Sequence, residues 1–424
     1  MRILVTGATG FIGSALASAL QQRGHQIIAC VHQSKDARLT PNMERMQVDY
    51  QSDTVESVWQ PRLKGVDIVI NAVGILRETR HASFDALHHL TPQALFRAAE
   101  KSGVKRVIQI SALGADGQAV SRYHCTKKAA DDALRACDLD WSIVQPSVVF
   151  GPGGASTELF LRLASMPITS LVGNGEQRMQ PIHIDDLTAL VVKLCEQTRV
   201  SKQTIAAVGP TPVTMREMLA AYRQALRLKP TLVFKTPLLM IRVVARIGDW
   251  LKVGALSTET LNMLLRGNTA PAQTITGLLG NAPRPISEFI PPQHAAAFRL
   301  RAQWAWLRPL LLSSVAAMWV VAGVASWLYG RDLGLSLLTK LGLGASSALL
   351  AFQFACALDV AMGLTTLLKP GRLLWQIQLG VIAFYTIALS FVMPSLWADP
   401  FGALMKNLPI AVLLVILKVT EPGR

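Results

Sequence analysis

Three long stretches in the last third of the chain contain almost no charged residue. Pro309–Leu328 and Leu373–Ala398 have none, and Leu341–Leu368 has only Asp359. Each stretch is long enough to cross a hydrocarbon core of about 30 Å, which takes about 20 apolar residues in a helix. Helices are required because lipid offers the backbone no hydrogen-bond partners. The sequence therefore predicts an integral membrane protein that ends in an all-α bundle.

A fourth apolar stretch, Ala403–Val419, is weaker because Lys406, Asn407 and Pro409 lie in its first half. A lysine near the interface can extend its ammonium group into water. We therefore favour four transmembrane helices over three helices and one surface helix. The predicted membrane domain covers residues 305–420, with spans at about 309–328, 345–368, 373–396 and 403–419.

The basic residues that flank these spans predict their orientation. With the N-terminal region in the cytoplasm, seven basic residues flank the inner face and three lie in the outer loops, which agrees with the positive-inside rule. The opening sequence MRILVTGATG lacks the apolar core and cleavage site of a signal peptide. We therefore expect a multi-pass protein of the inner (cytoplasmic) membrane with both termini cytoplasmic. The inner residues are Arg299, Arg301, Arg308, Lys369, Arg372, Lys418 and Arg424, and the outer ones are Arg331, Lys340 and Lys406.

Composition shows that the rest of the chain is different. The whole chain is 51% hydrophobic and 16% charged, with a mean hydropathy of +0.34, whereas soluble proteins are about a quarter charged. From Arg301 onward there are nine Lys/Arg and four Asp/Glu, which leaves 33 and 23 for the first 300 residues (42 − 9 and 27 − 4). This division excludes an entirely soluble enzyme, a disordered chain and a pure transporter.

The net charge of +15 has several explanations. Lys and Arg are dispersed, without a basic run or an aromatic-interleaved stripe, so nucleic-acid binding is not expected. An anionic lipid leaflet and an anionic cofactor are better explanations. The five cysteines are scattered without a CxxC pair, which indicates a reducing compartment and predicts neither disulfides nor a metal site.

The N-terminal region alternates predicted strands with predicted helices. A strand at Arg2–Thr6 leads through a glycine-rich turn into a helix at Ser14–Arg23, and a second strand follows at Gln26–Val31. Such alternation predicts an α/β fold with a doubly wound parallel sheet, which we assign to residues 1–200. A small, mostly helical lobe at 201–292 and a proline-containing linker at 293–304 are expected before the membrane domain.

The turn Gly7-x-x-Gly10-x-x-Gly13 predicts dinucleotide binding. The first glycine permits the tight turn, the second lets the backbone approach a pyrophosphate, and the third lets helix and strand pack closely. The start of the helix supplies free N–H groups for the phosphates. A three-glycine pattern alone also fits any tight turn, but its position between the first strand and the first helix favours a nucleotide site.

Residues after the second strand bear on the choice of cofactor. No acid follows this strand to bind the 2′-hydroxyl of NAD, whereas His32 and Lys35 or Arg38 are placed to meet the 2′-phosphate of NADP. NADP(H) is therefore preferred, and NAD(H) stays possible because these can be ordinary loop charges. Further along, Asp49 is a candidate acceptor for the adenine amino group. Asn71, Ala72, Val73 and Gly74 end the fourth strand where the adenosine ribose is expected.

Ser111, Tyr123 and Lys127 are the candidate catalytic residues. Tyr123 and Lys127 are four apart, so they share one face of a helix. A nearby cation favours phenolate and is expected to lower the pKa of the tyrosine for proton exchange with a carbonyl or an alcohol. Ser111 follows the fifth strand and is expected to hold the substrate oxygen. Alone, a Tyr–Lys pair is an ordinary helix face, but here it follows a dinucleotide turn.

Together these motifs resemble the extended or atypical short-chain dehydrogenases/reductases, and in particular the branch with the NAD(P)H-binding accessory subunit of respiratory complex I. The resemblance implies catalytic roles for Ser111, Tyr123 and Lys127, and nicotinamide contacts at Pro146, Ser147 and Val148. It also implies that the whole first turn, with Thr9, Phe11 and Ile12, contacts the cofactor. His32 departs from the arginine usual in NADP-preferring members, Gln145 from an arginine before the proline, and some members of the branch bind nucleotide without turnover. The matching blocks are Thr6–Gly13, Asp49, Asn71–Gly74, Ile110–Ala115, Tyr123–Lys127, Gln145–Gly154 and Pro181–Leu187.

Residues 305–420 resemble the DoxX-like family of four-helix membrane proteins, notably at Trp306–Val324 and Lys406–Leu417. Some members of that family associate with quinone-linked oxidases. Within this region an acid in a span, Asp359, is either a structural hydrogen-bonding group or part of a quinone, proton or substrate site. Possible partners are Gln353, Gln376 and Gln378.

Two main functions remain after this reasoning. The first is a membrane-tethered NAD(P)H-dependent oxidoreductase that acts on a carbonyl, alcohol or quinone-like carbon of a lipophilic molecule. The second is a non-catalytic nucleotide-binding protein of a membrane respiratory or quinone-related complex, and a redox sensor is a third. The amphipathic segment Leu238–Val253, with Arg242 and Arg246 four apart, either packs its apolar side on the lobe or lies on the bilayer.

Overall fold

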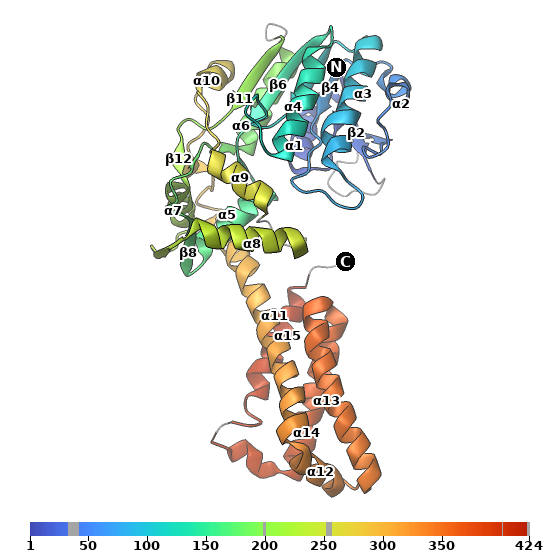
Figure 1. Cartoon of the computed structure of the whole chain (residues 1–424), viewed down its shortest axis with the longest axis vertical. Helices are drawn as coiled ribbons and strands as arrows, with labels where there is room; N and C mark the ends of the chain where they lie inside the picture. Colours follow the sequence, from blue (N-terminus) through green and yellow to red (C-terminus); the bar gives the residue numbers. More distant parts are fainter. Residues whose placement is uncertain (33–41, 198–200, 252–256, 401, 422–424) are drawn as a thin grey trace. The chain divides into compact units, whose positions relative to one another are not determined.

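The structure is a computed structural model that describes residues 1–32, 42–197, 201–251, 257–400 and 402–421. Two compact units divide the chain at Ala302 and Gln303. Figure 1 shows the course of the chain through both units. The first unit contains the predicted nucleotide-binding region, and the second contains the long apolar helices.

A seven-stranded parallel sheet forms the centre of the first unit, with the order β11-β6-β5-β4-β1-β2-β3. The order reverses between β1 and β4, and in open α/β sheets the ligand binds at the carboxyl ends of the strands at such a point. The predicted doubly wound fold is therefore confirmed. Its strands are β1 (Arg2–Thr6), β2 (Gln26–Val31), β3 (Glu44–Gln47), β4 (Ile68–Asn71), β5 (Arg106–Ile110), β6 (Asp140–Pro146) and β11 (Gln203–Ala207).

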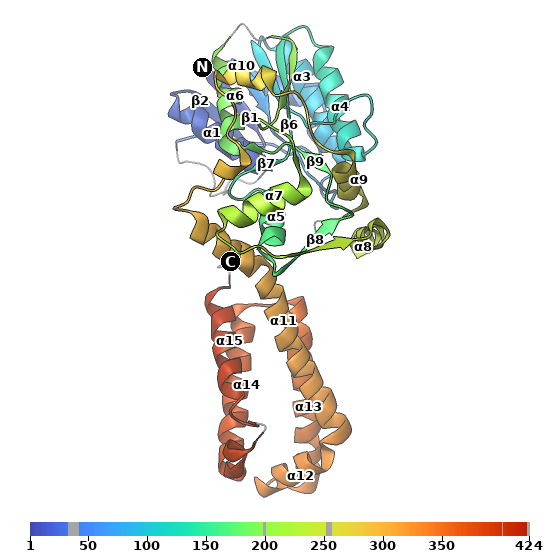
Figure 2. The ribbon, with the colours of Figure 1, turned by 90° about the vertical axis from the view of Figure 1, so that its left-hand side faces the viewer.

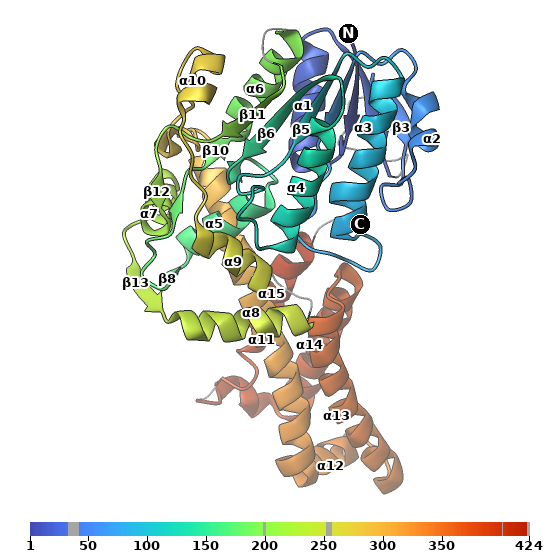
Figure 3. The same cartoon turned by 45° about the horizontal axis from the view of Figure 1, so that its top comes forward.

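Helices cover both faces of this sheet (Figure 3). Leu16 and Leu20 of one helix and Leu187 and Leu190 of another pack on one face, and Leu95 packs with the opposite face. The apolar strands are buried on both sides, which explains why they are almost continuously hydrophobic. The first face carries α1 (Phe11–Gln22), α6 (Ile184–Glu196) and α10 (Gln273–Leu279), and the second carries α2 (Glu56–Trp59), η1 (Gln60–Leu63), η2 (Asp85–Leu90), α3 (Thr91–Lys101) and α4 (Arg122–Arg135).

A small lobe follows, with a core around Phe150, Tyr222 and Phe289. Two predicted boundaries need correction. Strand β11 extends the sheet to residue 207, beyond the boundary at 200, because it pairs in parallel with β6. The lobe comprises β7 (Val149–Phe150), α5 (Ala155–Ser165), β8 (Ile168–Val172), β9 (Arg178–Met179), β10 (Ile182–His183), β12 (Val213–Thr214), α7 (Met215–Ala225), β13 (Leu232–Thr236), α8 (Leu238–Leu251), α9 (Thr258–Arg266) and η3 (Ile286–Glu288).

The second boundary concerns the expected linker at 293–304, most of which is helical. Helix α11 begins at Ala295 and runs to Tyr329, because alanine and long side chains favour helix and Pro292 lies just before its start. Figure 2 shows the long helices of the second unit. They are α11 (Ala295–Tyr329), α12 (Arg331–Lys340), α13 (Ala345–Leu368), α14 (Arg372–Val392) and α15 (Asn407–Val419), with η4 (Pro394–Ala398) between the last two.

Three of these helices, α11, α13 and α14, are long and apolar enough to cross a membrane. The fourth expected span corresponds to α15, which has 13 residues and is therefore only about 20 Å long. A fourth crossing thus stays a prediction. Small residues allow close packing, since a Cβ atom on Gly363 would lie 2.7 Å from the carbonyl oxygen of Ala316.

The buried acid of the second unit has a partner that the sequence did not predict. The Tyr385 hydroxyl donates to Asp359 Oδ1 at 3.4 Å. Of the three glutamines that we considered, Gln378 instead donates to Thr366 Oγ1, and Gln353 and Gln376 are exposed. The partner of Asp359 is therefore Tyr385, which lies seven residues after Gln378 on α14.

Candidate functional site

The glycine turn has the geometry that a dinucleotide site needs. Gly7 has φ +65°, and Gly10 N–H donates to the Gly7 carbonyl at 2.8 Å. A Cβ atom on Gly13 would lie 2.1 Å from the Gly7 oxygen, so only glycine lets α1 pack so closely on the turn. The assigned roles of the first and third glycines are thus visible in the backbone.

The start of α1 supplies the expected phosphate donors. Its N-cap is Gly10, and no side chain caps the first turn, which leaves the first N–H groups for an anion. Thr9, Phe11 and Ile12 are half-buried around this turn. A cavity of about 520 Å³ opens here, lined by Phe11, Ser14, Ala15, Pro152, Gly153 and Ile184. The described residues therefore fit a pyrophosphate at this position.

A second cavity, of about 420 Å³, marks the expected adenosine end, and His32 and Asp49 line it. Asp49 accepts from the Gln51 N–H and the Ser52 hydroxyl, which lowers the pKa of its carboxyl group. Arg62 also lines this cavity and pairs with Asp53 at 2.6 Å. The sequence reasoning missed this arginine because it follows β3 by 15 residues. Lys35 and Arg38 lie outside the described residues.

Asn71 has a structural environment. Its side chain is fully buried, accepting from the Thr6 and Tyr50 hydroxyls and donating to Gln109 Oε1. This network holds β1, β4 and β5 together at their carboxyl ends. Ala72, Val73 and Gly74 follow at the edge of the sheet, where the Ala72 N–H donates to the Thr6 carbonyl and the Val73 carbonyl accepts from Lys127.

Lys127 is directed to the same edge. Its ammonium group is buried and donates to the carbonyl oxygens of Val73 at 2.9 Å and Ile110 at 3.0 Å. A Cβ atom on Gly74 would lie 3.4 Å from Lys127 Nζ, so the absence of a side chain at Gly74 leaves space beside the ammonium group. Burial lowers the pKa of Lys127 to about 8, although Asp131 opposes the shift.

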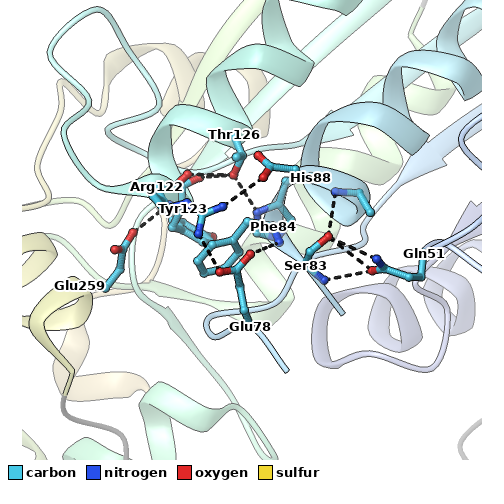
Figure 4. Close-up of polar contacts among 11 residues, drawn as sticks. Gln51, Glu78, Ser83, Phe84, His88, Arg122, Tyr123, Thr126 and Glu259 are labelled. Carbon is cyan, nitrogen blue, oxygen red and sulfur yellow. Dashed lines mark hydrogen bonds and ion pairs between the residues drawn. The ribbon is translucent and has the colours of Figure 1, made fainter. Parts of the chain in front are cut away.

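Tyr123 lies in an aromatic cluster (Figure 4). Its ring is 5.3 Å from His88 and 6.2 Å from Phe84, both edge to face. Burial raises the pKa of Tyr123 to about 12, with a further contribution from Asp131. This direction is opposite to the sequence-based expectation, because Lys127 directs its charge into backbone carbonyls while the phenol is desolvated.

Contacts from distant segments fix the start of α4. The Ser121 hydroxyl caps the helix by accepting from His124 N–H, and Glu259 of α9 accepts the Tyr123 N–H at 2.8 Å. Arg122 pairs with Glu78 at 2.8 Å, as Figure 4 shows. Ser121 and Glu259 thus satisfy two N–H groups at the start of the helix that have no partner within it. Through Glu259, the lobe holds Tyr123 in place.

Ser111 makes a contact that was not expected. Its hydroxyl donates to Asp131 Oδ2 at 2.6 Å, and Gln145 donates to the same oxygen at 3.3 Å. Burial raises the pKa of Asp131 to about 6, against the effect of these hydrogen bonds. The Ser111 proton is therefore directed into this network rather than toward Tyr123.

The predicted nicotinamide-binding strand end is well buried. Pro146 accepts from Leu113 N–H, and the Ser147 hydroxyl donates to the Gln180 carbonyl. Val148 is half-buried and its carbonyl accepts from Ile182 N–H. The Ser147 hydroxyl therefore holds the segment before the lobe strand β10 through Gln180. A nicotinamide at this position would contact the backbone and the Val148 side chain.

His88 is the main residue that the sequence reasoning missed. It stacks on Phe84, accepts from Ile75 N–H through Nε2 at 3.0 Å, and approaches Thr126 Oγ1 through Nδ1. Burial and Lys127 lower its pKa to about 2, so this ring is neutral. His88 therefore connects Ile75, in the loop after β4, to the Tyr123 ring. Sequence reasoning did not predict this role. His88 lies in a π-helical segment, a feature frequent at functional sites.

The sheet and the glycine turn give the first unit the fold of a Rossmann-type dinucleotide-binding domain. In agreement, residues 7–159 match the family described as NAD(P)H-binding, and residues 316–415 match the DoxX-like family. The chain thus joins an NAD(P)H-binding domain to a C-terminal domain of the DoxX-like family.

Two curated relatives are similar over the first domain and beyond. Ceramide reductase of Caulobacter vibrioides is 28% identical over 232 residues, which cover 54% of this chain and 72% of the relative. A mitochondrial protein of Arabidopsis thaliana, NADH dehydrogenase [ubiquinone] 1 alpha subcomplex subunit 9, is 28% identical over 289 residues, covering 61% and 70%. The resemblance to the complex I branch is therefore confirmed.

Solved structures share the fold of the first unit. A nucleoside-diphosphate-sugar epimerase of Staphylococcus aureus is 20% identical with a TM-score of 0.56, covering 68% of this chain and 99% of that chain. UDP-glucuronic acid 4-epimerase of Bacillus cereus, in complex with UDP-glucuronic acid and NAD, is 18% identical with a TM-score of 0.52, covering 73% and 100%. At these identities the likeness concerns the fold alone.

Proposed function

We propose that this protein is a membrane-tethered, NAD(P)H-dependent reductase of a lipophilic carbonyl compound. The observation that supports this most strongly is the buried Lys127 ammonium group beside Gly74, at the carboxyl edge of the sheet where the strand order reverses, with Tyr123 one helical turn before Lys127 on α4. A bound nicotinamide supplies hydride to the carbonyl carbon. Tyr123 supplies the proton to the carbonyl oxygen, and Lys127 binds the ribose and keeps a positive charge nearby.

The protonation state of Tyr123 is compatible with the role of proton donor. With its pKa raised to about 12, Tyr123 is a protonated phenol at neutral pH and can act as an acid without prior activation. In the opposite direction, an alcohol would need phenolate as the base, which is scarce at this pKa. We assign Ser111 to a positioning role, because its proton is used in the bond to Asp131.

The substrate class and location follow from the second unit. Three helices of this unit are able to cross a membrane, and a tether is useful when the substrate is concentrated in the bilayer. The name of the Caulobacter relative, ceramide reductase, supports a lipid substrate. We further propose an inner-membrane location with the nucleotide-binding domain in the cytoplasm, and a preference for NADP(H) through His32 and Lys35.

Replacement of Tyr123 by phenylalanine tests the proposed reaction. The full chain would be reconstituted in nanodiscs and assayed by NADPH absorbance with ceramide-like, isoprenoid and quinone-like carbonyl compounds. Loss of the general acid is expected to lower kcat by about 10²- to 10⁴-fold, with nucleotide affinity unchanged. Tyr329→Phe, at an exposed phenol, is the matched control. Turnover by Tyr123→Phe equal to that of the control would refute the role of this residue.

A second candidate function is a nucleotide-holding subunit of a membrane complex. It is favoured by the bond of Ser111 to Asp131 and by the similarity to the complex I subunit of Arabidopsis. Under this function, nucleotide co-purifies, resists exchange and is not oxidised by any carbonyl compound, and a partner protein co-purifies with the chain. Asp359→Asn would then disturb assembly while nucleotide binding stays normal.

A further inference from the structure

Helix α8 has an apolar face that no described part of the protein covers. Among the side chains of this helix that the structure describes, Ile241 and Ala245 are buried in the lobe core and Leu238 is partly buried against it. The exposed apolar residues include Leu239, at 73% exposure, and Val244, at 54%. The helix therefore exposes more apolar side chains than it buries, so packing on its own lobe does not explain its sequence. The five exposed apolar residues are Leu239, Met240, Val243, Val244 and Ile247.

These five residues form one continuous stripe. At about 100° per residue, they span about 140° of the helix circumference, and the buried pair lies on the other side. Arg242 and Arg246 are exposed and flank one edge of the stripe. No ion pair holds either arginine among the residues that the structure describes. An apolar stripe edged by free arginines is the pattern of a helix that lies in a membrane interface.

The neighbouring strand β13 adds to the apolar surface, as Figure 3 shows for its path into α8. Leu232 and Phe234 are 78% and 61% exposed and are two residues apart, so they share one face. Ile168 of β8 pairs with Leu232 and is also exposed. Contiguous exposed apolar surface of this kind marks an interaction site in a folded protein.

Chain connectivity makes a bilayer the natural partner. The first unit ends at Ala302, and the charge-free stretch of the first predicted span begins at Pro309. These residues belong to helix α11, in which seven residues rise about 10 Å, so the first predicted span tethers the first unit close to the membrane surface. The arginines match an anionic lipid surface in charge.

We propose that α8, together with β13, docks on the anionic headgroup surface of the bilayer. The apolar stripe inserts among the acyl chains near the headgroups, and Arg242 and Arg246 bind lipid phosphates. This inference concerns how the first unit meets lipid, and it stands whether or not the protein is a reductase.

Docking would also affect the candidate site through contacts within the first unit. Arg77 donates to the Gly248 carbonyl of α8 at 2.9 Å, and Thr258 at the start of α9 donates to Asp249. The next residue, Glu259, accepts the Tyr123 N–H. A helix that rests on lipid is therefore connected through Asp249, Thr258 and Glu259 to the residue that we propose as proton donor.

Site-specific fluorescence tests the docking. In a Cys125→Ser background, which removes the exposed cysteine of the described residues, Val244→Cys would carry an environment-sensitive fluorophore. The full chain would be reconstituted in vesicles of phosphatidylglycerol and phosphatidylcholine, with doxyl-labelled lipid as quencher. We expect a blue-shifted emission and strong quenching at position 244, and neither for Lys64→Cys, an exposed position before β4.

Replacement of the arginines separates the contribution of charge to membrane docking from the contribution of the apolar side chains. Each arginine near an anionic surface strengthens association about fivefold, so Arg242→Gln with Arg246→Gln is expected to weaken docking about 25-fold. Vesicles of pure phosphatidylcholine should give a similar loss. Nucleotide binding, measured by fluorescence, confirms that each variant is folded.

A label at position 244 that is as unquenched as the label at position 64 in anionic vesicles would overturn the proposal. Protection that depends on protein concentration rather than on lipid charge would overturn it too, in favour of a second copy of the chain.

Discussion

The two units differ in where they place buried polar groups. In the first unit, Lys127, Asp131 and His88 lie close together at one edge of the sheet, and burial shifts the pKa of each. Within the apolar helices of the second unit, polar groups such as Asp359 with Tyr385 and Gln378 with Thr366 form separate pairs that join one helix to another. Clustered shifted groups are typical of reaction sites, whereas isolated pairs are typical of helix association in lipid. The comparison agrees with the reaction site that we propose in the first unit.

The largest effect that tests this comparison is expected at Gly13. In Gly13→Ala, the new Cβ atom would lie 2.1 Å from the Gly7 oxygen. The backbone of the turn must shift to relieve this overlap, at a cost of about 3 kcal/mol in the free energy of the bound conformation. We expect nucleotide affinity to fall about 100-fold or more. Fluorescence titration with NADPH measures the change. Gly117→Ala is the control, since no atom lies within 4 Å of its added Cβ, and equal affinities in the two variants would contradict a nucleotide site at this turn.

The next effect concerns the pH dependence of reduction. Lys127 is charged below its pKa of about 8 and neutral above it, so the charge that binds ribose is lost as the pH rises. We expect kcat/KM to fall about tenfold per pH unit above pH 8. Steady-state rates measured from pH 6 to pH 10 would show this decrease on the alkaline side of the pH profile. Lys127→Met should have a lower and flat profile, and an unchanged alkaline limb in that variant would assign the titration to another group.

Sequence reasoning predicted the local parts of this site and missed its long-range parts. The glycine turn and the Tyr123–Lys127 pair each lie within one element, where spacing fixes geometry. The contact of Glu259 with Tyr123 joins residues 136 positions apart, and it depends on how the lobe packs. For the same reason, sequence reasoning did not predict that Ser111 would bond Asp131, since both residues also fit other roles.

The fold was easier to predict than the site because hydrophobic periodicity determines the elements one at a time. Strands such as Arg2–Thr6 and Gln26–Val31 and the three long apolar helices follow from such patterns. Domain boundaries did not, because β11 joins the sheet only through its pairing with β6. The sign of the pKa shift of Tyr123 also required the structure, because desolvation depends on every neighbour of the ring.

A smaller effect is expected for Glu421 in the second unit. Its carboxylate pairs with Arg308 at 3.0 Å and accepts from Trp375 Nε1 at 3.1 Å. Glu421→Gln weakens both contacts and is expected to lower the free energy of unfolding of this unit by about 1–2 kcal/mol. Thermal unfolding in detergent would measure it, with Asp332→Asn, an exposed acid, as the control. If the units are as separate as their polar groups indicate, NADPH affinity stays constant, and a parallel loss of affinity would show coupling.

The smallest effect is expected for Tyr385→Phe. The hydrogen bond from Tyr385 to Asp359 is long, at 3.4 Å, and hydrogen bonds between membrane helices contribute about 0.6 kcal/mol on average. If the pair only joins α13 to α14, Tyr385→Phe and Asp359→Asn lower stability by similar small amounts, and the double variant loses no more than either alone. Reduction of a lipid carbonyl would be unchanged in all three. A loss of activity in Asp359→Asn but not in Tyr385→Phe would instead mean that the carboxyl group acts on substrate or protons, and the second unit would then share in the chemistry that we place in the first.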